Sequence, residues 1–352
     1  MLELARAQAN RGHEVCVVSP AGMPENLHLG EVSAKQVPTR ARRPLRDYEY
    51  IVRSAKHVRA WRPDVVHVHA AADTIALRGL ASATYVLSLD YFRFRGSAHP
   101  WGHRYWRRCL DAYDLVLPVA TFCRDEVMSY YDLPASKLAV LYNGVDLDQF
   151  QPDDMAGAAF AARMGWESDE VRVLYLGRVC RQKGSEVLLK AFAEAATRHP
   201  RLRLLVAGPI GQFGDQGADP EGFLPRLRAP HIRYLGAVHE DDLRGLMNAA
   251  HIFCMPTLQD EMFGMAALEA QASGLPVVAS RHGGLPEAVA STGGLFVPPG
   301  DASALSDAFV DLAADPTRRD AMGGAGTEHA KAFAWSRLAE RSEQLYEAAG
   351  RA

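Results

Sequence analysis

The feature that most constrains this chain is an alternation, repeated in both halves, of short apolar runs with segments of helical length. The apolar runs cover residues 14–19, 64–69, 84–90, 114–119 and 138–142 in the first half, and residues 171–176, 202–207, 232–235, 251–255 and 277–279 in the second. This alternation is typical of parallel strands connected by crossover helices. The sequence therefore predicts an α/β fold with two doubly wound sheets.

The length of the chain and one polar stretch indicate two domains. At 352 residues the chain is too long for one ordinary hydrophobic core. Residues 143–146 lead into the turn-forming residues 150–154, which are typical of a linker. We expect one Rossmann-like domain over residues 1–150 and a second over residues 165–330. If the two sheets face each other, the carboxyl ends of their strands line a shared groove, and the chemistry is expected there.

Composition narrows the classes of function. The 39 basic and 42 acidic residues give a net charge of −3, which offers no excess of positive charge for a nucleic-acid binder. The five cysteines form no CxxC pair and have no zinc-site spacing with histidine, so neither a disulfide framework nor a metal site is expected. No apolar stretch approaches the roughly 18 residues of a membrane span. We expect a cytoplasmic protein.

The first candidate site follows the apolar run at residues 171–176. It begins with Gly177 and Arg178, continues to Lys183 and Gly184, and a helix is expected from about Ser185. Cations beside a helix N-terminus form a ready anion site, and the planar guanidinium of arginine fits phosphate oxygens. The alternative is that both cations are solvated loop charges.

The second candidate site contains two glutamates. Glu261 lies in a loop, and Glu269 lies inside a helix that is expected to start near Phe263. A carboxylate such as Glu269 can accept both hydroxyls of a ribose, the helix N-terminus can receive a phosphate, and Glu261 can meet sugar hydroxyls. The alternative is a helix with solvated acids. Against it, Glu269 is the sole charge in an otherwise apolar helix, and a buried charge needs a partner or a ligand.

Together these motifs resemble glycosyltransferase family 4, whose members are retaining enzymes of the GT-B fold. The resemblance rests on Gly177-Arg178 with Lys183-Gly184, on residues 261–269 and on residues 273–278. It extends over nearly the whole chain through residues 143–146, 282–287 and 294–301.

The resemblance implies a role for each site residue. Arg178 and Lys183, after Gly177, would hold the donor diphosphate, and Glu269 would hold the ribose. Glu261 would contact the transferred sugar together with the backbone of Phe263, Gly264 and Met265. Arg178, Lys183 and Glu261 are thus the expected catalytic residues.

The resemblance also implies the reaction. A hexosyl group would move from a nucleotide diphosphate sugar, with a UDP-sugar as the leading candidate, to a carbohydrate or lipid-linked acceptor. The implied transfer is front-face, without metal or cofactor, and the leaving phosphate helps to deprotonate the acceptor. Residues 331–352 would form a final helix that packs back on the N-terminal domain.

The sequence departs from the family pattern in two places. Family members begin with a strand and a glycine-rich loop, whereas residues 1–7 already have a helical pattern, so we expect this chain to lack that unit. Its absence would leave unpaired strand edges. In addition, residues 84–90 end in Asp90, where the family usually has a histidine facing the donor sugar. Asp90 is either a sugar contact or a simple strand-end turn residue.

The segment over residues 93–108 mixes arginines with aromatic side chains. It could bind a phosphorylated acceptor or the inner membrane face, but a surface helix with Tyr105 and Trp106 turned inward is favoured. His67 and His69 lie on one face of their strand and are expected to be satisfied rather than catalytic.

Two other functions stay open beside the transferase. One is a non-catalytic nucleotide-sugar binder, motivated by Asp90 and by the lack of the first strand. The other is a GT-B epimerase or phosphorylase, which no sequence feature favours.

Overall fold

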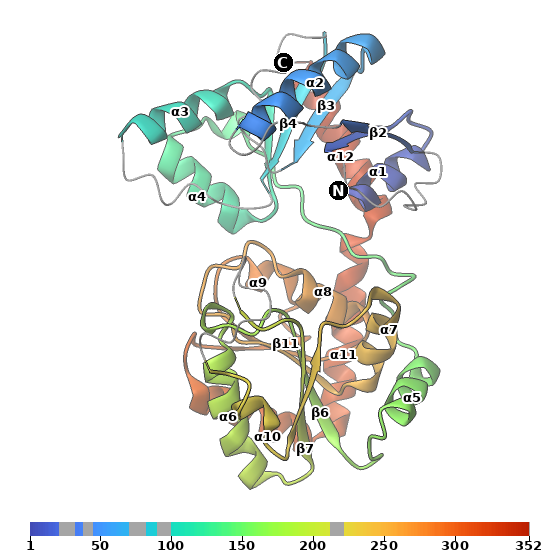
Figure 1. The fold of residues 1–352 in the computed structure, drawn as a ribbon, viewed down its shortest axis with the longest axis vertical. Coiled ribbons are helices and arrows are strands. Elements are labelled where there is room, and N and C mark those ends of the chain that lie inside the picture. The colour runs from blue at the N-terminus through green and yellow to red at the C-terminus, as the bar shows by residue number, and fades with distance from the viewer. Residues whose placement is uncertain (21–31, 38–44, 70–81, 90–99, 212–221, 352) are drawn as a thin grey trace. The chain divides into compact units, whose positions relative to one another are not determined.

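A computed structural model describes residues 1–20, 32–37, 45–69, 82–89, 100–211 and 222–351. The chain divides into two compact units (Figure 1). The N-terminal unit comprises Met1–Gly144 and Trp335–Ala352, and the C-terminal unit comprises Val145–Ala334. Each unit has the α/β organisation expected from the alternating pattern.

The described strands of the N-terminal unit form two parallel sheets. One pairs β1 (Cys16–Pro20) with β2 (Ser33–Val37), and the other has the order β3 (Val65–His69), β4 (Thr84–Leu89), β5 (Leu115–Pro118). The helices are α1 (Leu2–Ala9), α2 (Leu45–Trp61), α3 (Pro100–Asp111), α4 (Thr121–Tyr131) and α12 (Trp335–Gly350), with a 3₁₀ turn at Ala135–Lys137.

Both faces of the β3–β5 sheet are covered, as expected for parallel strands. Successive side chains of a strand point to opposite faces. Leu87 on β4 accordingly belongs to a core with side chains of α2, α3 and α4, whereas its neighbour Val86 packs with α1 and α12. The final helix α12 is fixed to α1 by Gln8, which donates to Ser342 at 2.9 Å, and by Arg11, whose ion pair with Glu343 spans 2.6 Å.

The strand expected over residues 138–142 does not form. Only Leu138 makes a bridge, to Val116 of β5. Ala139 and Leu141 donate to the carbonyls of Val116 and Pro118, but Pro118 has no N–H with which to return a bond. A regular parallel ladder therefore stops at this point.

The C-terminal unit is built on one parallel sheet of six strands in the order β11-β10-β9-β6-β7-β8. The strands are β6 (Val171–Leu176), β7 (Leu202–Ala207), β8 (Ile232–Gly236), β9 (Ile252–Met255), β10 (Val277–Ser280) and β11 (Gly294–Val297). The helices are α5 (Asp154–Arg163), α6 (Ser185–Arg198), α7 (Glu240–Ala249), α8 (Met265–Ala272), α9 (Leu285–Ala288), α10 (Ala302–Ala314) and α11 (Pro316–Ala330), with 3₁₀ turns at Arg181–Lys183, Arg226–Arg228 and Lys331–Phe333.

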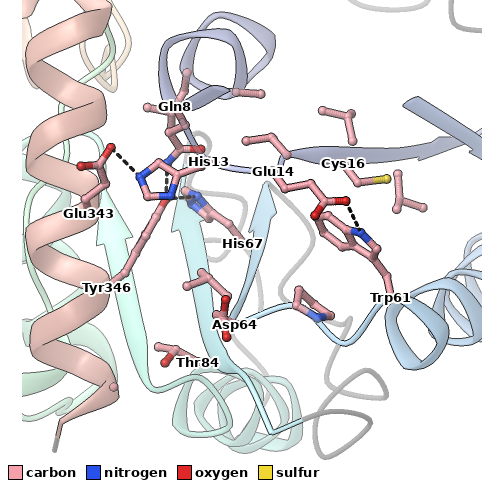
Figure 2. A pocket seen from close by; sticks show the side chains of 18 of the residues that line it. Gln8, His13, Glu14, Cys16, Trp61, Asp64, His67, Thr84, Glu343 and Tyr346 are labelled. Carbon is pink, nitrogen blue, oxygen red and sulfur yellow. Dashed lines mark hydrogen bonds and ion pairs between the residues drawn. The ribbon is translucent and has the colours of Figure 1, made fainter. Parts of the chain in front are cut away.

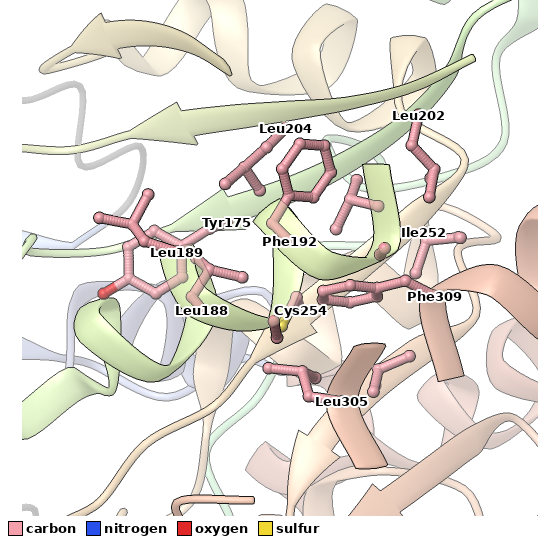
Figure 3. Close-up of a cluster of buried hydrophobic side chains, with 14 of the residues drawn as sticks. Tyr175, Leu188, Leu189, Phe192, Leu202, Leu204, Ile252, Cys254, Leu305 and Phe309 are labelled. Atoms are coloured by element: carbon pink, nitrogen blue, oxygen red, sulfur yellow. The ribbon is translucent and has the colours of Figure 1, made fainter. Parts of the chain in front are cut away.

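The main core of this unit lies between the sheet and the helices α6 and α10. Figure 3 shows Phe192 of α6 and Phe309 of α10 packed near Leu204 and Ile252 of the sheet. The two phenylalanine rings lie 6.5 Å apart, edge to face, and both side chains are buried. Burial of such aromatic pairs is a large hydrophobic contribution. It makes the strands of this unit a rigid base for the loops that follow them.

Among the described helices, none is both long and apolar enough to cross a membrane.

Candidate functional site

The strand order of the C-terminal unit indicates where a ligand would bind. From β6 the chain proceeds through β7 to β8 on one side, and then returns to the other side of β6 with β9. In open α/β sheets, ligands bind beyond the carboxyl ends of the strands at the point where the strand order reverses. The loops that leave β6 and β9 border this point. They are the two segments that carry the predicted site residues.

The loop after β6 is held against the end of β7. Gly177 donates to the carbonyl of Ala207 at 2.9 Å, and a Cβ atom on Gly208 would lie only 2.0 Å from the carbonyl oxygen of Gly177. The buried Tyr175 hydroxyl donates to the carbonyl of Arg178 at 2.6 Å. These contacts fix the backbone from which the half-buried Arg178 side chain extends.

The Arg181–Lys183 turn is locked to the loop after β9. Gly184 has a φ of +75° and packs so closely on Pro256 that a Cβ atom would lie 1.8 Å from its carbonyl oxygen. Leu258 donates to the carbonyl of Gln182 at 3.0 Å. Thr257, which is 0% exposed, adds a hydrogen bond to the carbonyl of Gln259 at 3.1 Å. The sequence did not single out Thr257, because its role depends on a contact between distant loops.

The backbone of Glu261 is held from the other side by the segment before α9. Gly284 donates to its carbonyl at 2.7 Å, and a Cβ atom on Gly283 would lie 2.3 Å from the same oxygen. Beside it, His282 and Asp260 approach to 3.4 Å as an ion pair when the histidine is protonated. This second support was also absent from the sequence interpretation.

The structure brings Lys183 and Glu261 into direct contact. The Nζ atom of Lys183 lies 2.5 Å from Oε2 of Glu261, and the two side chains are 20% and 19% exposed. The sequence placed both residues at the donor site but did not pair them. Two groups expected to hold different parts of the donor therefore neutralise each other.

Helix α8 begins at Met265, two residues later than expected, because Gly264 forms the N-cap with a φ of +106°. No side chain caps this end. The Phe263 side chain is 1% exposed and its ring lies 5.6 Å from that of Phe333. Its side chain is thus part of the core, and only its backbone is available near the helix N-terminus.

Glu269 lies one turn inside α8 among buried apolar residues. In the described part of the chain, no hydrogen bond or ion pair reaches its carboxylate, and burial raises its pKa to about 7. A carboxylate that has lost water without gaining a partner is prepared to accept hydrogen bonds from a ligand.

The remaining predicted residues lie outside this site or outside the described residues. Asp90 and residues 93–99 belong to the latter group. In α3, Arg107 donates to the carbonyl oxygens of Tyr131 and Asp132 and pairs with Asp111, so it stabilises its own unit. Tyr105 is 50% exposed, contrary to the expectation that it would turn inward.

His67 is satisfied, as expected. Its ring nitrogens lie 2.7 Å from the hydroxyl oxygens of Ser88 and Tyr346. Burial lowers its pKa well below the ordinary value, so the ring is neutral.

A cavity of about 740 Å³ lies in the N-terminal unit, and none of the residues expected to bind the donor is among its lining residues. Figure 2 shows it between β1, β3, α1 and α12, with His67, Tyr346 and Glu343 on its wall. Several of its polar groups are engaged with one another, since His13 lies 3.1 Å from Glu343 and Trp61 donates to Glu14 at 3.2 Å. Its size alone does not make it the donor site, because the acids Glu14, Asp64, Glu343 and Glu347 accompany Arg62 and Arg351 in its described lining and leave no excess of positive charge for a diphosphate.

In the described ranges, no three histidine, cysteine, aspartate or glutamate side chains are grouped as they would be around a metal ion.

Comparison with known protein families gives two matches, one in each half. The model described as Glycosyltransferase Family 4 matches residues 1–149, and the model described as Glycosyl transferases group 1 matches residues 170–315. Among curated proteins, the D-inositol 3-phosphate glycosyltransferase of Streptomyces avermitilis is 37% identical over 233 residues, which is 64% of this chain and 50% of that protein. The protein of the same description from Kribbella flavida is 35% identical over 64% of this chain and 54% of its own length. The chain thus spans about half the length of these relatives.

Solved structures share the fold at low sequence identity. HepE of Anabaena, solved in complex with UDP and glucose, has a TM-score of 0.82 at 16% identity, with 98% of this chain and 95% of that chain covered. Sucrose-phosphate synthase of Thermosynechococcus elongatus has a TM-score of 0.77 at 21% identity, with 98% and 91% covered. These similarities identify the fold as GT-B, with two Rossmann-like domains.

Proposed function

Because this chain belongs to glycosyltransferase family 4, we propose that it transfers a hexosyl group from a nucleoside diphosphate sugar to an acceptor hydroxyl. The observation that carries the proposal is the placement of two groups at one strand-order reversal: Arg178 and Lys183 follow β6, and the N-terminus of α8 follows β9 with Glu269, whose carboxylate has no described partner. Cations and helix amides suit a diphosphate, and a desolvated carboxylate suits a pair of hydroxyls. A nucleoside diphosphate contains both groups.

Arg178 and Lys183 are assigned to the diphosphate. When the bond between the anomeric carbon and the phosphate oxygen breaks, negative charge grows on the leaving diphosphate. Fixed cations stabilise that charge more in the transition state than in the ground state. The hydrogen bond from Tyr175 to the Arg178 carbonyl and the close packing of Gly184 support this role by fixing the backbone from which both side chains extend.

Glu269 is assigned to the ribose and Glu261 to the transferred sugar. The carboxylate of Glu269 accepts the ribose hydroxyls, which replace the water lost by burial. Glu261 and the backbone of residues 263–265 then lie nearer the sugar. Asp90 is assigned no role, because it falls outside the described residues.

The transfer is proposed to retain the anomeric configuration without a protein nucleophile. The acceptor oxygen attacks the anomeric carbon from the side of the leaving group, and its proton passes to the departing phosphate oxygen. The cations take the place of a metal, so neither a divalent ion nor a cofactor is included in the proposal.

The donor is proposed to be a UDP-sugar, and the acceptor a carbohydrate or a lipid-linked saccharide. The structures of HepE with UDP and with UDP-glucose support this choice of donor class. The relatives named for D-inositol 3-phosphate support a polyhydroxylated acceptor. If the acceptor is lipid-linked, we propose that the protein also contacts the inner membrane face peripherally.

The proposed function is tested by titrating UDP-, GDP- and ADP-sugars into the protein in excess EDTA, and by measuring release of the nucleoside diphosphate with and without acceptor saccharides. We expect one nucleotide series to bind in EDTA and its sugar to be transferred. Binding that disappears in EDTA and returns with manganese would overturn the metal-free site. Binding without transfer or hydrolysis would identify a non-catalytic sugar-nucleotide binder.

A further inference from the structure

Lys183 and Glu261 form an ion pair at the centre of the candidate donor site. The distance of 2.5 Å between Nζ and Oε2, and the exposure of only about one fifth for each side chain, place the pair in a partly desolvated position. Coulomb attraction is stronger there than between fully solvated charges. The ammonium group of Lys183 is therefore already paired, and an anionic ligand that binds it must compete with the carboxylate of Glu261.

The two residues of this ion pair lie on two loop segments whose backbones are fixed by close packing and hydrogen bonds. On the lysine side, Gly184 packs against the Pro256 carbonyl and Gln182 accepts a hydrogen bond from Leu258. On the glutamate side, Gly283 and Gly284 pack against the backbone of Glu261. The contact can therefore break by side-chain rotation alone, without movement of either loop.

We propose that Glu261 is an internal competitor for the donor diphosphate, which holds Lys183 until the complete nucleotide sugar replaces both halves of the ion pair. This inference rests on the proposed function and adds regulation of the same site. The phosphate oxygens take the ammonium of Lys183, and the sugar hydroxyls donate to the carboxylate of Glu261.

The consequence is discrimination between substrate and product. A nucleoside diphosphate that lacks the transferred sugar can bind the ammonium of Lys183, but its ribose hydroxyls are assigned to Glu269. No hydroxyl then reaches Glu261, whose carboxylate is left without its cation. Separation of a partly buried pair is costly when one charge stays uncompensated. The complete donor compensates both groups, so the pair weakens binding of the product more than binding of the substrate and favours its release.

The test is a titration of UDP, GDP and ADP into the full chain at low ionic strength in EDTA, using the nucleotide that wild type binds most tightly. Glu261→Gln removes the competing charge and keeps the shape of the side chain, so we expect this variant to bind the diphosphate roughly fivefold more tightly. Glu186→Gln is the matched control, because Glu186 is an acid at the start of α6 that pairs with Arg181 and not with Lys183. It should change the affinity less than about twofold.

Two further variants distinguish the competitor role of Glu261 from the phosphate-binding role of Lys183. Lys183→Met should weaken the diphosphate, and in that background Glu261→Gln should have no further effect. If Lys183→Met weakens binding but Glu261→Gln alone leaves it unchanged or weaker, the internal competitor is refuted while the phosphate site stands. If Lys183→Met leaves binding unaltered, the phosphate role of Lys183 is refuted, and the competitor with it.

Discussion

At the scale of one residue, the desolvated carboxylate of Glu269 lowers the stability of its own fold. Burial raises its pKa from the ordinary value of 4.5 to about 7. A group whose pKa is higher in the folded state contributes stability below its unfolded pKa and loses that contribution as the pH rises through the folded value. The charged carboxylate therefore costs stability above about pH 7.

Glu269→Gln is expected to stabilise the empty protein at pH 8. The neutral amide has no charge to desolvate, so a rise in Tm of roughly 2–4 °C is expected, which is the shift produced by about 1 kcal/mol in a unit of this size. At pH 5 the gain should shrink, because the wild-type carboxyl group is then largely protonated in the fold. Thermal unfolding of both proteins at the two pH values measures this. An equal Tm at pH 8 would contradict a partnerless, desolvated carboxylate.

The same variant is expected to bind nucleotide less well. Loss of a charged acceptor costs about 1.5–3 kcal/mol. In wild type, affinity should fall as the pH drops below about 7, because the protonated carboxyl group accepts fewer hydrogen bonds. In Glu269→Gln the affinity for a nucleotide sugar, whose diphosphate does not titrate in this range, should be low and independent of pH. Calorimetric titration between pH 5.5 and 8 tests both statements, and a parallel pH dependence in the two proteins would remove Glu269 from the ribose.

Arg178 should be sensitive even to a conservative change. Arg178→Ala is expected to lower turnover more than it raises the KM of the donor, since the leaving diphosphate gains charge only as the bond breaks. Arg178→Lys should restore activity incompletely, because lysine lacks the planar fork of donors. Steady-state kinetics with the true donor gives the measurement. Near-normal turnover of a folded Arg178→Ala protein would show that this arginine is only a loop charge.

At the scale of elements, the effect of a glycine after the Arg181–Lys183 turn depends on its packing. Gly184 and Gly165 have similar positive φ values of 75° and 63°, but a Cβ atom would meet the Pro256 carbonyl at position 184 and nothing within 4 Å at position 165. Either alanine costs about 1–2 kcal/mol for the left-handed backbone. Gly184→Ala should lose a further 1–3 kcal/mol, roughly, through overpacking.

The two glycine variants therefore form a matched pair. Urea unfolding should show the larger loss for Gly184→Ala, and nucleotide titration should show weakened binding in this variant alone, because Lys183 precedes the displaced residue. Equal losses of stability and unchanged binding in both would mean that the 3₁₀ turn is free to adjust.

The sequence predicted most elements because the period of the apolar residues reports which faces are buried. The runs at residues 171–176 and 202–207 coincide with β6 and β7, and the helix expected from Ser185 is α6. The prediction failed at residues 138–142, where the run is apolar but the neighbouring strand ends in Pro118. Apolar character predicts burial, whereas a strand also needs a partner that can donate hydrogen bonds.

The candidate site residues were predicted from local motifs, but their contacts were not. Lys183 and Glu261 are 78 positions apart in the chain, and they meet only because β9 returns beside β6. Thr257 and Gly283 likewise act through loops that come together in the folded unit. Periodicity and short motifs carry no information about which strand order a sheet adopts, so these contacts required the structure.

At the scale of the whole molecule, partly buried histidines make the fold sensitive to acid. His251 accepts a hydrogen bond from the Arg172 amide at 3.0 Å, and burial, together with Arg172 and Arg319, lowers its pKa from 6.5 to about 4. The unfolded chain therefore takes up a proton first as the pH falls below 6.5. Stability from this residue is complete above that value and is lost between about pH 6.5 and 4.

His251→Asn should reduce the loss of stability that accompanies a fall in pH from 6.5 to about 4. The asparagine side-chain oxygen can replace Nδ1 as the acceptor but does not titrate in this range. We expect the decline in Tm between pH 6.5 and 4.5 to be smaller than in wild type, while Tm at pH 7.5 is similar or slightly lower. Calorimetric scans over this range measure the slope. An unchanged slope would mean that other groups, such as His67, dominate the acid response.

The proposed function requires a nucleoside diphosphate sugar to bind in the C-terminal unit where the strand order reverses between β6 and β9. Hydrogen–deuterium exchange of the full chain, with and without the nucleotide sugar that binds in EDTA, tests this location directly. We expect slower exchange in peptides covering residues 177–184 and 256–269, on the two loops that carry Lys183 and Glu261. Protection confined to peptides around the cavity between β1 and β3, with none in these two loops, would contradict it.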